Sequence, residues 1–420
     1  MWFSGSSSFP TYFDDNGTKV YSELVRVDAW GNALSVTRPG CNADMDNSST
    51  LALHQYSMHE MRFVPELSAA RDPALLVSGY AVHALGAGGL KYTADGRNYS
   101  SDDLISGTVF KWRPAAAASG GAELSELLDL GDTVTPELTG LVNVGVGDME
   151  VEVTCGGASP TFRGVDYMHQ SSCAASAADG ATTVLSSLRN LNAVIASDVE
   201  SGEVAWVLAS DPSLNTSYKT YAFAHEQEKF YYPHMVSQLP DGHVLLVDDG
   251  NNRPGCARGS EGSCYSRAVE YALVDGRVRV DARSGVLVSD EGEAAAKNGT
   301  TNASATYADG VARLVWQFEA PFNFSDPRAT NGHGRVNEAD DLDSKIGNSV
   351  SRLEASGHYV VGFTTLTRGR DTYAEIFDVT AKGTLHAAMR VHNVSFYGDG
   401  AYRALPYETI YGETRACPLG

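Results

Sequence analysis

The stretch that decides the fold reads YYPHMVSQLPDGHVLLVDDG from Tyr231 to Gly250. It places His234 five residues ahead of the turn LPDG at 239–242, which leads into the apolar run VLLV at 244–247. The acidic residues and glycine at 248–250 then stop that run. This pattern predicts a histidine at the head of a strand, followed by a tight turn and a buried strand. A histidine held on a rigid strand is a candidate catalytic residue.

The arrangement of histidine, turn and strand recurs along the chain. His59 has Val64-Pro65 in the same register ahead of LLVSGY, and His169 leads, after three extra residues, into the strand TTVLSSL. In a fourth copy, GNSVSRLEASGHYVVGF, Asn348 occupies the position of the histidine. The copies are one or two units of about 60 residues apart, a little longer than common propeller blades.

A second repeated unit consists of two short strands around an Asp/Gly turn. It occurs at residues 23–35, 192–208, 269–280 and 374–385, with shortened forms at 105–112 and 309–318. About six hairpins, together with 42 glycines and short apolar runs, predict an all-β fold, a six-bladed β-propeller with surface insertions.

In such a propeller the equivalent turns of all blades meet at one mouth of the central channel, which would bring His59, His169 and His234 together. We expect residues 1–20 to be an exposed N-terminal segment and residues 21–420 to form the propeller. The polar stretch at about 289–307 is expected to be an inserted surface loop.

The charge of the chain excludes several classes of partner. A formal net charge of −21 and a pI near 4.8 argue against binding to nucleic acid or to an anionic membrane surface. No apolar run is long enough for a bilayer, so the chain is not expected to span a membrane. An anionic substrate would have to be met by local basic groups.

Cysteines and sequons predict an extracellular protein. The six cysteines lack metal-type C-x-x-C pairs and allow fifteen disulfide connectivities. Cys256 with Cys264, Cys155 with Cys173 and Cys41 with Cys417 are candidate pairs. Eight Asn-x-Ser/Thr sequons are candidate glycosylation sites: Asn16, Asn47, Asn98, Asn215, Asn298, Asn302, Asn323 and Asn393. We therefore expect a secreted or cell-surface protein whose signal peptide lies outside this numbering, with extracellular protein or glycan partners.

Two acidic clusters invite a calcium interpretation. Asp248-Asp249 and Asp340-Asp341-x-Asp343 lack the spacing of an EF-hand loop, so both are interpreted as solvated turns. No metal site is expected from the sequence.

Several blocks in order resemble the arylsulfate sulfotransferase (ASST-like) family. DYMH at 166–169 with VLSSLRNLNAVIASDVESGEVAWVL at 184–208 is similar to its signature blade, and the stretch from His234 to YSRAVEYAL at 265–273 is similar to the next. The resemblance covers roughly residues 20–415. It implies a six-bladed propeller that uses no nucleotide sulfate donor, so no cofactor is expected. It also implies transfer of a sulfuryl group from an aryl sulfate to a phenol through a sulfated histidine.

By motif, the resemblance assigns the nucleophile to His234 and supporting roles to His59, His169 and Arg189. Arg189 suits a sulfate clamp because a guanidinium fork matches tetrahedral oxyanions. Ser171 replaces an asparagine and Met235 replaces an acidic residue of the family pattern.

The same residues also have structural interpretations. His234 could cap a blade turn, His54 competes with His59 for the first-blade position, and Arg189 could pair with an acidic neighbour. Tyr231 and Tyr232 could border the pocket and stack on an aryl ring.

Neutral imidazole can attack the sulfur, and a second histidine can serve as general acid and then as general base. The alternative function is an extracellular structural or adhesive glycoprotein with a catalytically degenerate propeller. A third is a sulfate-ester hydrolase, in which water replaces the phenol.

Overall fold

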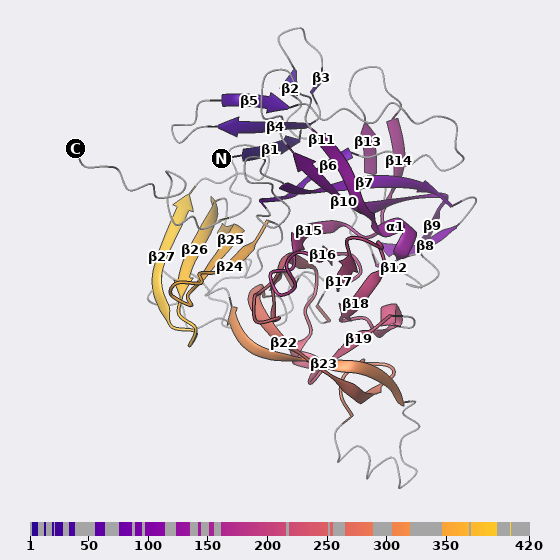
Figure 1. Ribbon diagram of the computed structural model, residues 1–420, viewed down its shortest axis with the longest axis vertical. Coiled ribbons are helices and arrows are strands. Elements are labelled where there is room, and N and C mark those ends of the chain that lie inside the picture. Colours follow the sequence, from indigo (N-terminus) through magenta and orange to yellow (C-terminus); the bar gives the residue numbers. More distant parts are fainter. Residues whose placement is uncertain are drawn as a thin grey trace, which may run out of the picture.

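The computed structural model of this chain is built almost entirely of β-strands (Figure 1). It describes residues 2–6, 12–13, 19–20, 22–27, 33–37, 55–63, 75–85, 89–94, 97–113, 123–134, 142–143, 151–154, 161–215, 218–250, 253–254, 265–288, 305–319, 347–368, 371–392 and 404. Within these ranges the helices are short: α1 (Leu130–Thr133), η3 (Pro212–Asn215) and η4 (Glu226–Glu228). The prediction of an all-β chain is confirmed.

Sixteen of the described strands form four antiparallel meanders of four consecutive neighbours each. The first two comprise β6 (Gln55–Phe63), β7 (Leu75–Ala84), β10 (Asp103–Arg113) and β11 (Glu123–Asp129), then β15 (Gln170–Ala175), β16 (Thr183–Leu188), β17 (Ala193–Asp198) and β18 (Val204–Ala209). The other two comprise β20 (Pro233–Gln238), β21 (Val244–Asp248), β22 (Arg267–Asp281) and β23 (Ala305–Glu319), then β24 (Ser349–Arg352), β25 (Tyr359–Arg368), β26 (Asp371–Val379) and β27 (Leu385–His392).

The second and third meanders share one nine-stranded sheet. Strand β19 (Thr220–Phe223) runs parallel to both β18 and β23 and joins them. The sheet is nearly closed, because its two edge strands, β15 and β20, lie against each other. The Val236 N–H of β20 donates to the Ser172 hydroxyl of β15 over 2.8 Å. Six antiparallel and two parallel pairings separate the edge strands, so β15 and β20 run in the same direction.

The first strands of successive meanders neighbour one another. Strand β6 lies against β15, β15 against β20, and β24 against β20 and β21. In Figure 1 the meanders follow one another from β7 and β10 at the top, through β15–β18 and β22–β23, to β24–β27 at the left. This arrangement fits blades around a shared centre, and the number of six blades stays a prediction.

The remaining described strands pair outside the meanders. β1 (Trp2–Ser6), β4 (Ser22–Val27) and β5 (Ala33–Thr37) form one sheet, and β2 (Tyr12–Phe13) pairs with β3 (Lys19–Val20). β8 (Leu90–Ala94), β9 (Arg97–Ser101) and β12 (Val142–Asn143) form another sheet, while β13 (Val151–Thr154) pairs with β14 (Thr161–Asp166). β14 also runs parallel to β10.

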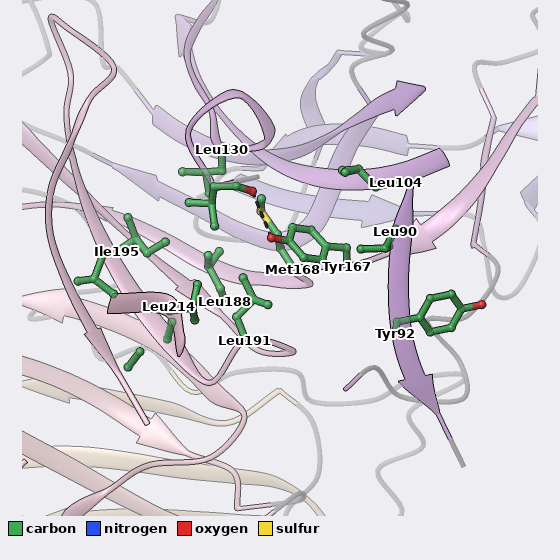
Figure 2. Close-up of a cluster of buried hydrophobic side chains, with 14 of the residues drawn as sticks. Leu90, Tyr92, Leu104, Leu130, Tyr167, Met168, Leu188, Leu191, Ile195 and Leu214 are labelled. Atoms are coloured by element: carbon green, nitrogen blue, oxygen red, sulfur yellow. Dashed lines mark hydrogen bonds between the residues drawn. The ribbon is translucent and has the colours of Figure 1, made fainter. Parts of the chain in front are cut away.

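The core beneath the second meander fixes the loops that precede and follow its first hairpin (Figure 2). Tyr167 and Met168 are fully buried ahead of β15, and Leu188 and Leu191 flank the turn between β16 and β17. The Tyr167 hydroxyl donates to the Val134 carbonyl oxygen over 3.2 Å. Burial of such side chains is worth about 1.5–3 kcal/mol each, which holds these loops rigidly.

The predicted register of the four copies is confirmed. Residue 59 lies in β6, His169 stands immediately before β15, His234 lies in β20 and Asn348 immediately precedes β24. Each of these strands is the first of its meander. A second strand rich in buried residues follows in each copy, and in the second, third and fourth copies a described turn joins the two strands.

The hairpin predictions are confirmed in part. Residues 23–35, 192–208 and 374–385 each contain two paired strands. Residues 269–280, 105–112 and 309–318 instead lie inside the single strands β22, β10 and β23, so hairpins there are wrong. In β22 a register shift between Asp275 and Val278 takes up Gly276 as a bulge, and pairing with β23 continues on both sides. Residues 289–304 of the predicted loop lie outside the described residues.

Candidate functional site

His169 is held by a carboxylate from the turn that carries it. Its Nδ1 lies 2.7 Å from Asp166 Oδ2, and its backbone N–H donates to Asp166 Oδ1 over 3.0 Å. Asp166 is buried, and Asn190 Nδ2 anchors the Asp166 carbonyl oxygen over 2.7 Å. An unprotonated Nδ1 would be repelled by the carboxylate at this distance, so the contact favours the form of the ring with the proton on Nδ1. In this tautomer of the neutral ring, Nε2 carries the lone pair.

His234 is fixed by the next copy in the register. Its Nδ1 donates to the backbone carbonyl oxygen of Asn348 over 3.2 Å. Asn348 is itself fully buried: its Nδ2 donates to Asp249 Oδ1 over 2.7 Å, and its Oδ1 accepts from the Thr364 N–H over 3.1 Å. Because a carbonyl oxygen only accepts hydrogen bonds, it selects the tautomer of His234 with the proton on Nδ1. In this neutral form Nε2 carries the lone pair that a nucleophile needs.

Arg189 connects the two histidine-bearing segments. Its backbone N–H donates to the His169 carbonyl oxygen over 3.0 Å, and its guanidinium lies 4.2 Å from the centre of the Tyr232 ring. The Tyr232 N–H donates to Asn192 Oδ1 over 2.8 Å, two residues ahead of His234. Arg189 therefore stacks on an aromatic ring, and its Nη1 also reaches Asn190 Oδ1 over 3.3 Å.

Backbone conformations with positive φ concentrate in the segments that carry His169, Arg189 and His234. Among the described non-glycine residues, five have positive φ, and four of them are His169, Asn192, Tyr232 and Met235, with φ of 42–54°. The left-handed region costs such residues roughly 1 kcal/mol or more each and persists where surrounding contacts enforce it. At His169 and Tyr232 the enforcing contacts are the hydrogen bonds that their backbone N–H groups donate to Asp166 Oδ1 and Asn192 Oδ1. Clustered strain of this kind favours a functional site over a plain turn.

A buried ion cluster around Asp248 anchors the start of the stretch that carries His234. Asp248 is fully buried, and its Oδ2 accepts from Arg253 Nη2 over 2.5 Å and from Arg267 Nε over 2.8 Å. Its Oδ1 accepts from the Tyr231 N–H over 2.9 Å. Burial, with smaller contributions from neighbouring charges, raises the pKa of Tyr231 to about 12, so the phenol stays neutral.

The interpretation of Asp248-Asp249 as a solvated turn is wrong. Both side chains are fully buried and hydrogen-bonded, Asp248 to two arginines and Asp249 to Asn348. A buried carboxylate requires compensating cations or donors, and these come from residues distant in sequence. Asp340, Asp341 and Asp343 lie outside the described residues.

The segments that carry four of the predicted site residues are neighbours: Arg189 contacts the His169 carbonyl oxygen and the Tyr232 ring, and β20, which carries His234, lies against β15. Ser171 is fully buried, and its hydroxyl donates to the His169 carbonyl oxygen over 3.4 Å, within its own turn. Tyr231 belongs to the Arg253 side instead, with that guanidinium 5.1 Å from its ring centre. His59 lies in β6, which packs against β15, and its side chain and all of His54 lie outside the described set.

Sequence reasoning missed Asp166 and Asn192 as partners of the site. Asp166 stands three residues ahead of His169 in the quoted DYMH, and an Asp-x-x-His turn was the available signal. Asn192 carried no local signal, because its partner Tyr232 lies 40 positions away.

Few of the predicted modification sites fall on described residues. Asn98 lies exposed in β9, Asn215 ends η3, and Cys173 is buried in β15. The other six sequons and the other five cysteines lie outside the described residues, so the predicted disulfides and glycans stay predictions. None of the helices in the described ranges has the length and apolar character needed to cross a bilayer.

Two solved structures are among those similar to this chain. One is a proposed 6-phosphogluconolactonase from Bacteroides fragilis, 11% identical over 90% of this chain and 92% of its own, with a TM-score of 0.24. The other is Hsv2 from Kluyveromyces lactis, 7% identical over 90% of this chain and 97% of its own, with a TM-score of 0.22. TM-scores this low carry no argument about the fold.

A comparison with curated proteins gave no match. The family model of the arylsulfotransferases (ASST) matches residues 122–277. That segment contains the whole second meander and the turns that hold His169, Arg189 and His234. The resemblance to the arylsulfotransferases predicted from the sequence is thereby confirmed over residues 122–277.

Proposed function

We propose that this protein transfers a sulfuryl group from an aryl sulfate ester to a phenol, with His234 as the nucleophile. The observation that carries the proposal is the hydrogen bond from His234 Nδ1 to the Asn348 carbonyl oxygen. In the neutral ring, this hydrogen bond keeps the proton on Nδ1 and so leaves Nε2 unprotonated. The family match over residues 122–277 supports an arylsulfotransferase-like function in general.

In the first half-reaction His234 Nε2 attacks the sulfur, and the bond between sulfur and the aryl oxygen breaks. The departing phenolate takes a proton from His169 Nε2–H. The Asp166 carboxylate, 2.7 Å from Nδ1, orients the His169 ring and stabilises its protonated form. General acid catalysis of this kind is worth about 10²–10⁴-fold in rate.

The sulfated His234 then carries a positive ring and a negative sulfonate group. Its Nδ1–H keeps the Asn348 carbonyl as acceptor, which favours the positively charged ring. In the second half-reaction His169 takes the proton of the acceptor phenol, whose oxygen attacks the sulfur as the bond from sulfur to Nε2 breaks. Arg189 would supply positive charge to the sulfuryl oxygens, and the Tyr232 ring under its guanidinium holds that group in place.

The finer architecture and setting belong to the same proposal. We infer a six-bladed propeller in which the four described meanders are blades and the first strands line the channel. We also infer a secreted, glycosylated protein on the basis of its eight sequons and six cysteines.

The proposal is tested with 4-nitrophenyl sulfate in the presence and absence of a phenol acceptor. Release of 4-nitrophenol that requires the acceptor supports the transferase, and release without it supports a hydrolase. His234→Ala should abolish turnover and the acid-labile labelling of the protein by a ³⁵S-sulfate donor. His225→Ala is the matched control, because His225 is exposed and its side chain does not cap η4.

A structural or adhesive glycoprotein is the second candidate. His234 is only 2% exposed, and the Ser171 hydroxyl is directed to its own turn, which favours a site that has lost turnover. Folded, glycosylated protein that neither turns over aryl sulfates nor becomes labelled by them would select this candidate over the enzyme.

A further inference from the structure

A second histidine cluster lies in the fourth meander and belongs to no part of the proposed reaction. His358, Asp378 and His386 come from the turn before β25, from β26 and from β27. His358 Nδ1 lies 2.8 Å from Asp378 Oδ1, and His386 Nδ1 lies 3.0 Å from Asp378 Oδ2. The two imidazole rings meet edge to face with centres 5.3 Å apart. Both nitrogens therefore converge on one carboxylate.

A β-bulge in β27 directs the His386 side chain toward Asp378. Asp378 is opposite Ala387 and Val379 is opposite Leu385, so His386 is the extra residue on its strand. Bulges leave the extra residue unpaired and redirect its side chain in this way. His358 follows Gly357, whose φ of +67° allows the tight turn, and the Leu353 N–H closes that turn on the His358 carbonyl oxygen. The three donor groups are thus positioned by separate local structures.

Two other clusters of the described residues hold acidic groups beside a histidine, and neither is suited to a metal. Asp129 beside His83 already accepts from the Ser106 hydroxyl and the Gly131 N–H. In the other, Glu270 accepts from Tyr359, and the Arg352 guanidinium lies 3.6 Å from its second oxygen. A nearby guanidinium repels a divalent cation. Among the described residues, only the two imidazoles contact the two carboxylate oxygens of Asp378.

The donor set fits a divalent transition metal. Two imidazole nitrogens and one carboxylate oxygen lie within 4.8 Å of one another. Metal bonds of about 2.0–2.2 Å place the ligands of a tetrahedral ion about 3.3 Å apart, so small side-chain rotations suffice. Imidazole with carboxylate suits Zn²⁺, Cu²⁺, Ni²⁺ or Fe²⁺, whereas Ca²⁺ and Mg²⁺ require oxygen ligands.

We propose that His358, Asp378 and His386 form a binding site for one divalent transition metal ion of the zinc type. Both histidines bind through Nδ1 and carry their proton on Nε2. His386 is 65% exposed along its side chain, so water completes the coordination.

The bound ion would fasten the edge of the fourth sheet. In the described part of the chain β27 pairs with β26 alone, and it exposes Met389 and Val391 to solvent. Three ligands from the turn before β25, from β26 and from β27 cross-link the meander at one end. The expected consequence is slower opening of β27, with no effect on the chemistry at His234.

The first test measures binding of Zn²⁺ to the full chain by equilibrium dialysis after treatment with a chelator. The double variant His358→Ala/His386→Ala should bind one equivalent fewer than the parent protein. His225→Ala, which removes an exposed histidine elsewhere, should bind as many as the parent. Equal stoichiometry in the double variant and the parent would overturn the proposal.

A second measurement separates a ligand role from a structural one. Co²⁺ should give visible absorption bands in the parent that are lost in Asp378→Asn, while circular dichroism of the variant stays that of a folded β protein. Hydrogen exchange in β27 should slow on addition of Zn²⁺ in the parent and not in Asp378→Asn. Unchanged Co²⁺ bands in the variant, or exchange in β27 that ignores Zn²⁺, would contradict the site. Neither variant is expected to lose aryl sulfate turnover. The metal test is therefore independent of the proposed enzyme function, and the failure of one would not imply the failure of the other.

Discussion

His234 and Asn348 lie 114 positions apart, yet a single hydrogen bond between them defines the chemical state of the candidate nucleophile. The acceptor is a main-chain carbonyl oxygen, so the tautomer depends on the position of the backbone and not on the identity of the side chain at 348. The Asn348 side chain in turn fixes that backbone through Asp249 and Thr364. The asparagine that replaces histidine in the fourth copy therefore holds the carbonyl group that His234 of the third copy contacts.

Asp166 provides the sharpest prediction at the scale of a residue. Asp166→Asn removes the charge beside His169 Nδ1 while keeping a similar shape, so kcat should fall by about 10²–10⁴-fold. The loss should grow with the pKa of the leaving phenol, because a poor leaving group depends most on proton donation. The measurement is kcat across a series of substituted phenyl sulfates.

Asp198→Asn is the matched control for that series. Asp198 accepts the N–H groups of Glu200 and Ser201 in an exposed turn remote from the site. Its variant should keep full activity. A rate loss in Asp166→Asn that is uniform across all leaving groups would contradict the positioning of a general acid.

At the scale of elements, a stacked aromatic pair and a buried carboxylate are among the contacts that join the third and fourth meanders. Trp316 of β23 stacks on Tyr359 of β25, with ring centres 3.7 Å apart. The Tyr359 hydroxyl donates over 2.6 Å to Glu270 of β22, which is buried. Burial, followed by this hydrogen bond and the charge of Glu270, raises the pKa of Tyr359 and keeps its proton in place.

Two substitutions of Tyr359 separate these contributions. Tyr359→Phe keeps the stack and leaves one Glu270 oxygen without its donor, so the free energy of unfolding should fall by about 1–3 kcal/mol. Tyr359→Ala also removes the ring and should cost about 3–5 kcal/mol. Urea unfolding measures both, with the exposed Tyr307→Ala expected within about 0.5 kcal/mol of the parent. Equal losses in the two Tyr359 variants would show that the stack contributes nothing.

The start of α1 gives a prediction for acid stability. Burial alone would raise the pKa of Asp129, but hydrogen bonds from His83, Gly131 and Ser106 and the charge of His83 hold it below its ordinary 3.8. A carboxyl whose folded pKa is depressed contributes stability above the unfolded pKa and loses that contribution as the pH falls through the folded pKa. Between about pH 4 and pH 2 the parent should therefore lose stability more steeply than Asp129→Asn. Urea midpoints over this range that fall in parallel for both proteins would contradict the assignment.

At the scale of the whole molecule, charge opposes the proposed substrate. A protein of net charge −21 repels an aryl sulfate anion at long range, while Arg189 attracts it only at short range. Screening by salt weakens the long-range repulsion first, since the Debye length is about 10 Å at 0.1 M.

Raising NaCl from about 10 to 200 mM should therefore increase kcat/KM for the sulfate donor. The KM of an uncharged phenol acceptor, measured in the same buffers, should stay constant. A fall of donor kcat/KM with salt would mean that local cations dominate the approach and that the global charge has no role.

The fold was predictable to the level of its repeats. Alternating apolar runs and Asp/Gly turns are local signals, so the strands after residues 59, 169, 234 and 348 and the hairpins near 23–35, 192–208 and 374–385 were found in sequence. The same turn residues misled at 269–280, because Gly276 in a long strand becomes a bulge when a partner strand continues past it. Turn residues produce a hairpin only where no neighbouring strand continues to pair past them.

The sequence by itself determined an all-β chain, a repeated register, and the candidates His169, Arg189 and His234 within the arylsulfotransferase-like segment. The tertiary structure alone decided the rest. It set the tautomer of His234, the burial of Asp248 and the convergence of His358 on His386. The physical reason is that strand and turn patterns are properties of neighbouring residues, whereas hydrogen-bond partners and burial arise between strands that meet only when the sheets assemble.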